Sequence, residues 1–194
     1  MVDEQVADLV TQVAQARRKV VEAVAGLGGD QEAFRPAEGE WSLPEIVEHL
    51  FLAEQVGVNR IWYAAQAARQ GTPAWSGDTP HGGRGIDEVI EETWAISGRG
   101  PISVRTTETA PAAAVPQLRG PLGYWVACLA ASQQVVQQLG AALAGLDLAT
   151  VIYPHAVSGP LDARQRLEFL RWHLDHHRQQ IEDLKTAPGF PGRP

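Results

Sequence analysis

Four long segments of the chain place apolar residues three and four positions apart, which is the spacing of one face of an α-helix. They cover about residues 3–27, 43–69, 121–143 and 160–185. Two stretches rich in glycine and proline, 71–85 and 98–120, separate the second segment from the third, with a short helical pattern over 86–96 between them. No stretch carries a convincing strand pattern. The sequence therefore predicts an all-α fold, a four-helix bundle with long connections between helices 2 and 3.

The second helix has the clearest start. Ser42 is followed three residues later by Glu45, as in a capping box, and Pro44 suits the first helical turn. Trp41 and Ile46 are placed as a hydrophobic staple around that cap. These signals fix the beginning of the segment on which the first candidate functional residue lies.

Length and charge limit the possible classes of protein. With 194 residues the chain suits one domain over 1–186, followed by a Pro/Gly-rich tail, 187–194, that we expect to be flexible. A net charge of −7 argues against nucleic acid as a partner. We expect no membrane partner and a cytoplasmic location, because no apolar run reaches about 18 residues and the first residues do not resemble a signal peptide.

Three histidines fall where a bundle core would normally have leucine. His173 and His177 are four residues apart and so share one face of the last helix. His49 lies on the apolar face of the second helix. If the two helices face each other, three imidazoles converge and leave further coordination positions open, as in a reactive metal site.

A purely structural reading competes with this one. A single core histidine is usually satisfied by hydrogen bonds, but several on facing stripes need many partners, whereas one ion satisfies a nitrogen of each ring. Gln180, one turn beyond His177, is placed to orient a metal-bound water or a substrate. Alternatively, Gln180 is a polar residue that fixes the register of the helices.

The other reactive side chains have simpler interpretations. Glu45 lies one turn before His49 and could hold that ring, but capping is the preferred role. We expect His81 and His155 to lie in loops at the surface. Cys128 sits among apolar residues and suits a packing role, because buried cysteines are chemically inert.

Three ordered segments resemble the DinB/YfiT-like superfamily of bacterial four-helix-bundle proteins. FRPAEGEWSLPEIVEHL is similar to the segment that carries the family's first histidine ligand, and TAPAAAVPQLRG to the linker before its third helix. SGPLDARQRLEFLRWHLDHHRQQI resembles the family's last helix, with its two further histidines. Gln179 stands where the family often has glycine. The resemblance covers about residues 34–181.

This resemblance implies a divalent metal ion, commonly zinc or nickel, bound by His49, His173 and His177, and frequent homodimers. It also implies reactions of low-molecular-weight thiols such as mycothiol or bacillithiol. The leading hypothesis is thus a metal-dependent enzyme that activates a thiol or water on a small-molecule substrate, S-transferase-like or hydrolase-like. The alternatives are a non-catalytic metal- or small-ligand-binding dimeric bundle, and a degenerate member whose histidines form a metal-free core.

Overall fold

The computed structural model describes residues 2–96 and 112–192, which form six α-helices, two 3-10 turns and one two-stranded antiparallel sheet. The chain is therefore mostly helical, as predicted. The elements are, in order, α1 (Val2–Ala23), α2 (Asp30–Ala33), α3 (Leu43–Arg69), α4 (Ile86–Ile96), η1 (Ala112–Ala114), α5 (Leu122–Leu143), η2 (Leu148–Thr150), β1 (Ile152–His155), β2 (Gly159–Asp162) and α6 (Ala163–Thr186).

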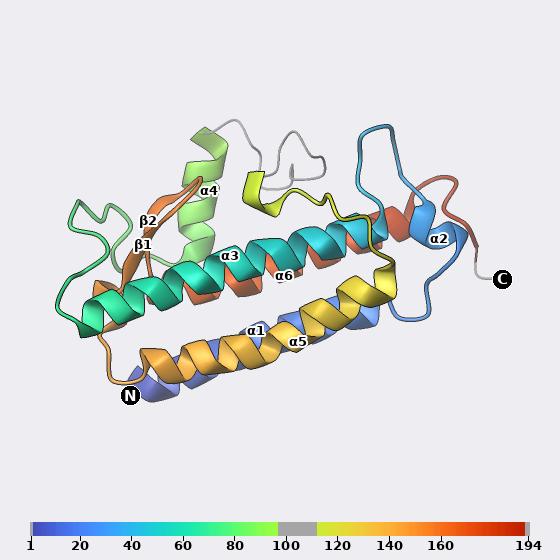
Figure 1. Cartoon of the computed structure of the whole chain (residues 1–194). Helices are drawn as coiled ribbons and strands as arrows, with labels where there is room; N and C mark the ends of the chain where they lie inside the picture. The colour runs from blue at the N-terminus through green and yellow to red at the C-terminus, as the bar shows by residue number, and fades with distance from the viewer. Residues whose placement is uncertain (1, 97–111, 193–194) are drawn as a thin grey trace.

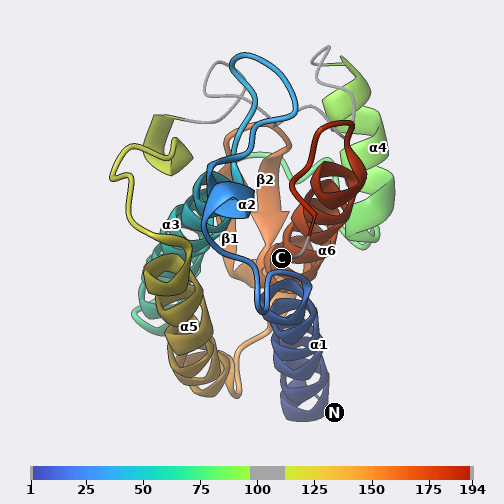
Figure 2. The ribbon, with the colours of Figure 1, turned by 90° about the vertical axis from the view of Figure 1, so that its right-hand side faces the viewer.

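The four long helices lie side by side (Figures 1 and 2). α1 and α6 run in one direction and α3 and α5 in the other, so the start of α3 lies beside the end of α6. Each contributes fully buried residues to a shared core, among them Val13, Leu43, Leu129 and Leu167. The second and last long helices, α3 and α6, therefore lie against each other and run antiparallel, while the specific DinB/YfiT-like bundle topology remains a prediction.

The connection between α3 and α5 carries α4, which stands outside the four long helices beside α6 (Figure 2). α4 spans the residues that the short helical pattern predicts. Of the predicted irregular stretch 98–120, the part before residue 112 lies outside the described residues. The part that is described includes η1, which packs on α3.

Local signals account for the helix ends. The carboxylate of Glu45 accepts hydrogen bonds from the backbone N–H and the hydroxyl of Ser42, both at 2.8 Å, so the predicted cap of α3 is confirmed. α1 ends at Ala23, one turn before the predicted end, and its chain then turns through Gly26 at a φ of 73°. Glycine adopts that left-handed conformation without steric cost.

The prediction of a loop and a helix starting at residue 160 was wrong. Ile152–His155 and Gly159–Asp162 pair as an antiparallel hairpin, and α6 begins after it. Asp162 accepts a hydrogen bond from the backbone of Gln165 at 2.8 Å, and the Gln165 side chain accepts one from Asp162 N–H at 3.1 Å. This reciprocal cap is what delays the start of α6.

The described part of the C-terminal tail contacts the α2 region. The Phe190 ring packs edge-on against Phe34 with centroids 5.3 Å apart, and Gln31 donates a hydrogen bond to the Pro191 carbonyl. The flexibility expected of 187–194 stays untested. Within the described residues, no helix combines the length and apolar character needed to cross a bilayer.

Candidate metal centre

His49 of α3 meets His173 and His177 of α6 inside the protein, and we call these three residues the histidine cluster. The Nε2 atom of His173 lies 3.2 Å from Nε2 of His49 and 3.2 Å from Nε2 of His177. Their exposed fractions are 1%, 7% and 0% for His49, His173 and His177. The structure thus brings together the three residues that the sequence singled out, with the same ring nitrogen of each pointing to a common centre.

The second nitrogens of two rings fix where their protons lie. Nδ1 of His49 is 2.7 Å from the carbonyl oxygen of Ala114, and Nδ1 of His177 is 2.7 Å from Oε1 of Gln180. Because both oxygens only accept, each Nδ1 carries the proton and donates it. Nε2 of a neutral ring is then bare, so two lone pairs face His173.

Burial keeps these rings neutral. It lowers the pKa of His49 to about 4, with a further contribution from the nearby His176. Burial also lowers the pKa of His173 and of His177 well below the ordinary value of 6.5, and the neighbouring imidazoles add to the effect. At neutral pH the rings therefore present lone pairs, which is the form that binds metals.

Hydrogen bonds among the rings cannot satisfy all three. His173 has at most one proton on Nε2, and that proton can serve only one of the two bare nitrogens beside it. By contrast, three nitrogens held about 2.0–2.1 Å from one tetrahedral ion lie about 3.3–3.4 Å apart. The two observed separations of 3.2 Å are close to that value. The cluster fits a cation better than it fits a hydrogen-bonded core.

The Ala114 carbonyl is held in place by a neighbour of His49. The Glu48 carboxylate, 1% exposed, accepts the backbone N–H groups of Gln117 and Leu118 at 2.6 and 2.8 Å. These bonds fasten the segment after η1 onto α3, so that the Ala114 carbonyl lies at the Nδ1 edge of the His49 ring. Second nitrogens held in this way are typical of metal-binding histidines.

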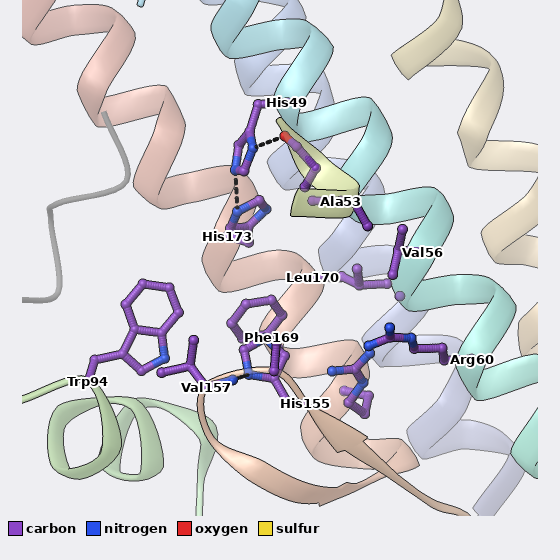
Figure 3. Close-up of a pocket in the computed structure, with 15 residues that line it drawn as sticks. His49, Ala53, Val56, Arg60, Trp94, His155, Val157, Phe169, Leu170 and His173 are labelled. Carbon is purple, nitrogen blue, oxygen red and sulfur yellow. Dashed lines mark hydrogen bonds between the residues drawn. The ribbon is translucent and has the colours of Figure 1, made fainter. Parts of the chain in front are cut away.

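Aromatic rings enclose the cluster on two sides. Trp41 packs against His49 with centroids 4.7 Å apart and lies 6.5 Å from His177. Phe169 stacks on His173 at 5.5 Å. On the remaining side His49 and His173 line a cavity of about 110 Å³ that runs toward the hairpin (Figure 3). The centre is therefore shielded from bulk water but open to a small molecule.

Gln180 is buried and holds His177 through Nδ1, on the opposite side of the ring from the converging nitrogens. It lines a separate hollow beside Trp41 and not the cavity at His49. A positioning role for Gln180 follows from this contact. Its predicted role in orienting water or substrate remains a prediction.

Other residues differ in how well the sequence placed them. Glu45 caps α3, as the preferred interpretation predicts. The Nδ1 atom of His49 is hydrogen-bonded to the Ala114 carbonyl instead. Cys128 is a free, half-buried residue packed against the core. The expectation of surface positions was wrong for His81, which is buried, and for His155, which is half-buried and lines the cavity. His155 is covered because it belongs to the β1–β2 hairpin. His81 is held beside α6, where its carbonyl accepts a hydrogen bond from the Gln165 side chain at 2.6 Å.

The sequence reading missed two arginines that line the same cavity, Arg60 of α3 and Arg166 of α6. A signal for them exists. Arg60 follows His49 by eleven residues and Arg166 precedes His177 by eleven, so each arginine shares a helix face with a cluster histidine. The Ala114 carbonyl leaves no such signal, because every residue has one.

Fold and site together define a mostly helical protein with a buried group of three histidines that could hold a metal ion. The profile of the DinB superfamily matches residues 12–181, and the chain belongs to that superfamily. No curated protein and no solved structure matches the chain significantly. The family resemblance inferred from three segments is thereby confirmed.

Proposed function

We propose that this protein is a divalent-metal-dependent enzyme in which His49, His173 and His177 hold zinc or nickel. The ion would activate a low-molecular-weight thiol or water toward a small-molecule substrate, in an S-transferase-like or hydrolase-like reaction. The observation that carries the proposal is the convergence of three Nε2 atoms, two of which are bare because their Nδ1 protons are used elsewhere.

A divalent cation with open positions lowers the pKa of a thiol or water, which supplies a nucleophile at neutral pH. The chain's own residues would prepare the site for that chemistry. Ala114 and Gln180 hold the two ligand rings in one tautomer, so little reorganisation is needed on binding. Trp41 and Phe169 exclude bulk water, which strengthens electrostatic interactions inside the site.

The accessible side of the centre favours a catalytic over a purely structural ion. His49 and His173 form part of the cavity wall, so a ligand in the cavity reaches the centre directly. A structural ion would more commonly have four protein ligands and no such opening. The partners we propose are a small-molecule substrate, a thiol in the transferase case, and a second copy of the chain in a homodimer.

Elemental analysis of protein purified without an affinity tag tests the proposal. We expect about one equivalent of metal per chain in the wild type, as for a single three-histidine site. His177→Ala should lose it, whereas His176→Ala, which removes the adjacent half-buried ring, should retain it. A wild type that neither carries nor takes up zinc or nickel would contradict the proposal.

Turnover assays on the loaded protein then separate the candidates. Consumption of an electrophile only when thiol is present indicates a transferase, and ester hydrolysis without thiol indicates a hydrolase. Bound metal without turnover in either panel would indicate the non-catalytic binding protein instead. His177→Ala serves as the blank in each assay.

A further inference from the structure

The cavity beside the histidine cluster has a second polar end. Arg60 and His155 lie at the end away from His49 and His173, and apolar residues including Val56, Leu170 and Phe169 lie between (Figure 3). Arg166 also lines the cavity, reaching it from α6. The cavity is therefore bipolar, with neutral nitrogen ligands at one end and guanidinium groups at the other.

Antiparallel packing of α3 and α6 produces this arrangement. Along α3, Arg60 is eleven residues beyond His49, a rise of about 16 Å. Along α6, Arg166 is seven residues before His173, a rise of about 10 Å. The helices run in opposite directions. Their histidines therefore meet at one level, and their arginines line the cavity at another.

Arg166 is an unusual residue to find buried. Its exposed fraction is 4%, and its Nη1 atom has no hydrogen-bond partner among the described residues. Its Nη2 atom would lie 3.8 Å from a Cβ at Gly57, so the guanidinium is close against the α3 backbone. Burial and the charge of Arg60 lower the pKa of Arg166 to about 10, which still leaves it charged at neutral pH.

The described groups near Arg166 are a second guanidinium and a hydrogen-bond donor, and they provide no carboxylate to balance the charge. Arg60 lies over the Tyr153 ring, with its guanidinium carbon 5.5 Å from the centroid. Nδ1 of His155 accepts the backbone N–H groups of Val157 and Ser158, so the proton of that neutral ring is on Nε2. Within the described parts of the chain, no carboxylate is paired with Arg60 or Arg166.

Two like charges beside a largely apolar cavity are costly unless an anion joins them. A carboxylate matches the planar fork of a guanidinium and can accept two hydrogen bonds from it. The volume of about 110 Å³ admits several non-hydrogen atoms, since one water needs about 10–15 Å³. The apolar walls between the two ends suit a hydrocarbon body.

We infer that Arg166 and Arg60 form a carboxylate-binding subsite, and that the substrate is a small organic acid with an apolar body whose other end reaches the histidine cluster. Calling this acid a substrate rests on the proposed function, because it assumes that the protein is an enzyme. Binding of the acid itself requires the arginines and not the metal. The two ideas can therefore fail separately.

Calorimetric titration of metal-stripped protein tests the subsite. The probes are butanoate, hexanoate, octanoate and benzoate, each compared with its neutral amide. We expect at least one acid to bind at least about tenfold more tightly than its amide, as for loss of a buried charged partner. Arg166→Met and Arg60→Met should abolish that preference, and Arg18→Met, at an exposed position on α1, should keep it.

Two variants keep the test decisive if Arg166→Met misfolds. Arg166→Lys keeps the charge and loses the fork, so it should retain part of the preference. Arg60 is only half-buried, so Arg60→Met decides the question if Arg166→Met does not fold. Equal binding of acids and amides across the panel would overturn the inference. So would acid binding that requires added metal, is lost in His177→Ala and is unchanged in Arg166→Met.

Either reactant of a thiol transfer can supply the carboxylate. Comparing hexanoate with 6-mercaptohexanoate on metal-loaded protein distinguishes the two. If the mercapto acid binds more tightly and His177→Ala removes this gain in affinity, the carboxylate belongs to the thiol reactant. Equal binding of the two assigns it to the electrophile.

Discussion

α3 carries two buried polar clusters on different sides, and only one of them contains its own counterion. Glu54 accepts a hydrogen bond from Arg17 of α1 at 2.6 Å, and Arg17 also donates to Gln133 of α5; we call these three residues the arginine–glutamate cluster. Glu54 is five residues after His49, or about 140° around the helix. The three histidines, Arg17 and Glu54 are almost completely excluded from solvent, and Gln133 is half-buried.

The difference lies in charge and in donors. The arginine–glutamate cluster contains both signs of charge, so the fold supplies its own counterion. The histidine cluster contains only neutral rings whose bare nitrogens face one another, so it lacks a positive centre. A buried charge whose counterion the chain supplies holds helices together, whereas a cluster of lone pairs without a positive centre is suited to binding a cation.

Breaking the ion pair should have the largest effect on stability. Glu54→Leu leaves Arg17 buried without a counterion, which we expect to lower the free energy of unfolding by about 3–5 kcal/mol. Urea unfolding measures it. Metal content should stay at the wild-type level. The double variant Arg17→Met, Glu54→Leu should recover most of the loss, and an unchanged single variant would show that the pair is not stabilising.

Removing the metal should affect only the other cluster. A chelator is expected to lower the free energy of unfolding by about 2.7 kcal/mol when the free metal had been at 100 times its dissociation constant. Melting curves with and without chelator measure this shift. Glu54→Leu should show the same shift and His177→Ala none. A shift that persists in His177→Ala would place the metal elsewhere.

The buried histidines and the buried carboxyl of Glu54 should also respond to pH with opposite sign. Burial lowers the pKa of His49 to about 4 and that of His155 to about 3. Below pH 6.5 these imidazoles therefore become protonated in the unfolded chain while they stay neutral in the folded chain. Stability from these groups is complete above about pH 6.5 and is lost as the pH falls toward those values. Burial raises the pKa of Glu54, so its carboxyl gives a slope of the opposite sign.

Urea unfolding of metal-free protein at pH 7, 6 and 5 checks this dependence. Each such histidine should contribute a slope of up to about 1.4 kcal/mol per pH unit. His155→Phe should flatten the profile, and Glu54→Gln should steepen it. A stability that is constant from pH 7 to pH 5 would contradict neutral buried rings.

The smallest expected effect comes from the residue behind His177. Gln180→Leu removes the acceptor that holds the Nδ1 proton, and we expect about tenfold weaker metal binding with the fold intact. Competition with a chromogenic chelator measures the affinity. Gln179→Leu is the matched control, because Gln179 is exposed and, among the described residues, bonds only to Asp183. Equal affinity in both variants would remove Gln180 from the site.

Sequence patterns predicted the features that depend on neighbours along the chain. The helical periodicity and the Ser42 cap located α3, and the four-residue spacing placed His173 and His177 on one face. The same kind of signal was present for Asp162 and Gln165 and for the arginine positions, but its meaning was missed. The hairpin and the meeting of Arg60 with Arg166 depend on contacts between distant segments, which periodicity does not encode.

The contact between His49 and Ala114 has a consequence for how the molecule would respond to its ligand. The same hydrogen bond that orients the ring also fastens the segment around residues 112–118 to α3, together with Glu48. Binding of a cation and docking of that segment would then be thermodynamically coupled, and the coupling would be reciprocal. A change that undocks the segment would weaken the metal affinity by a certain factor. Metal binding would disfavour undocking by the same factor.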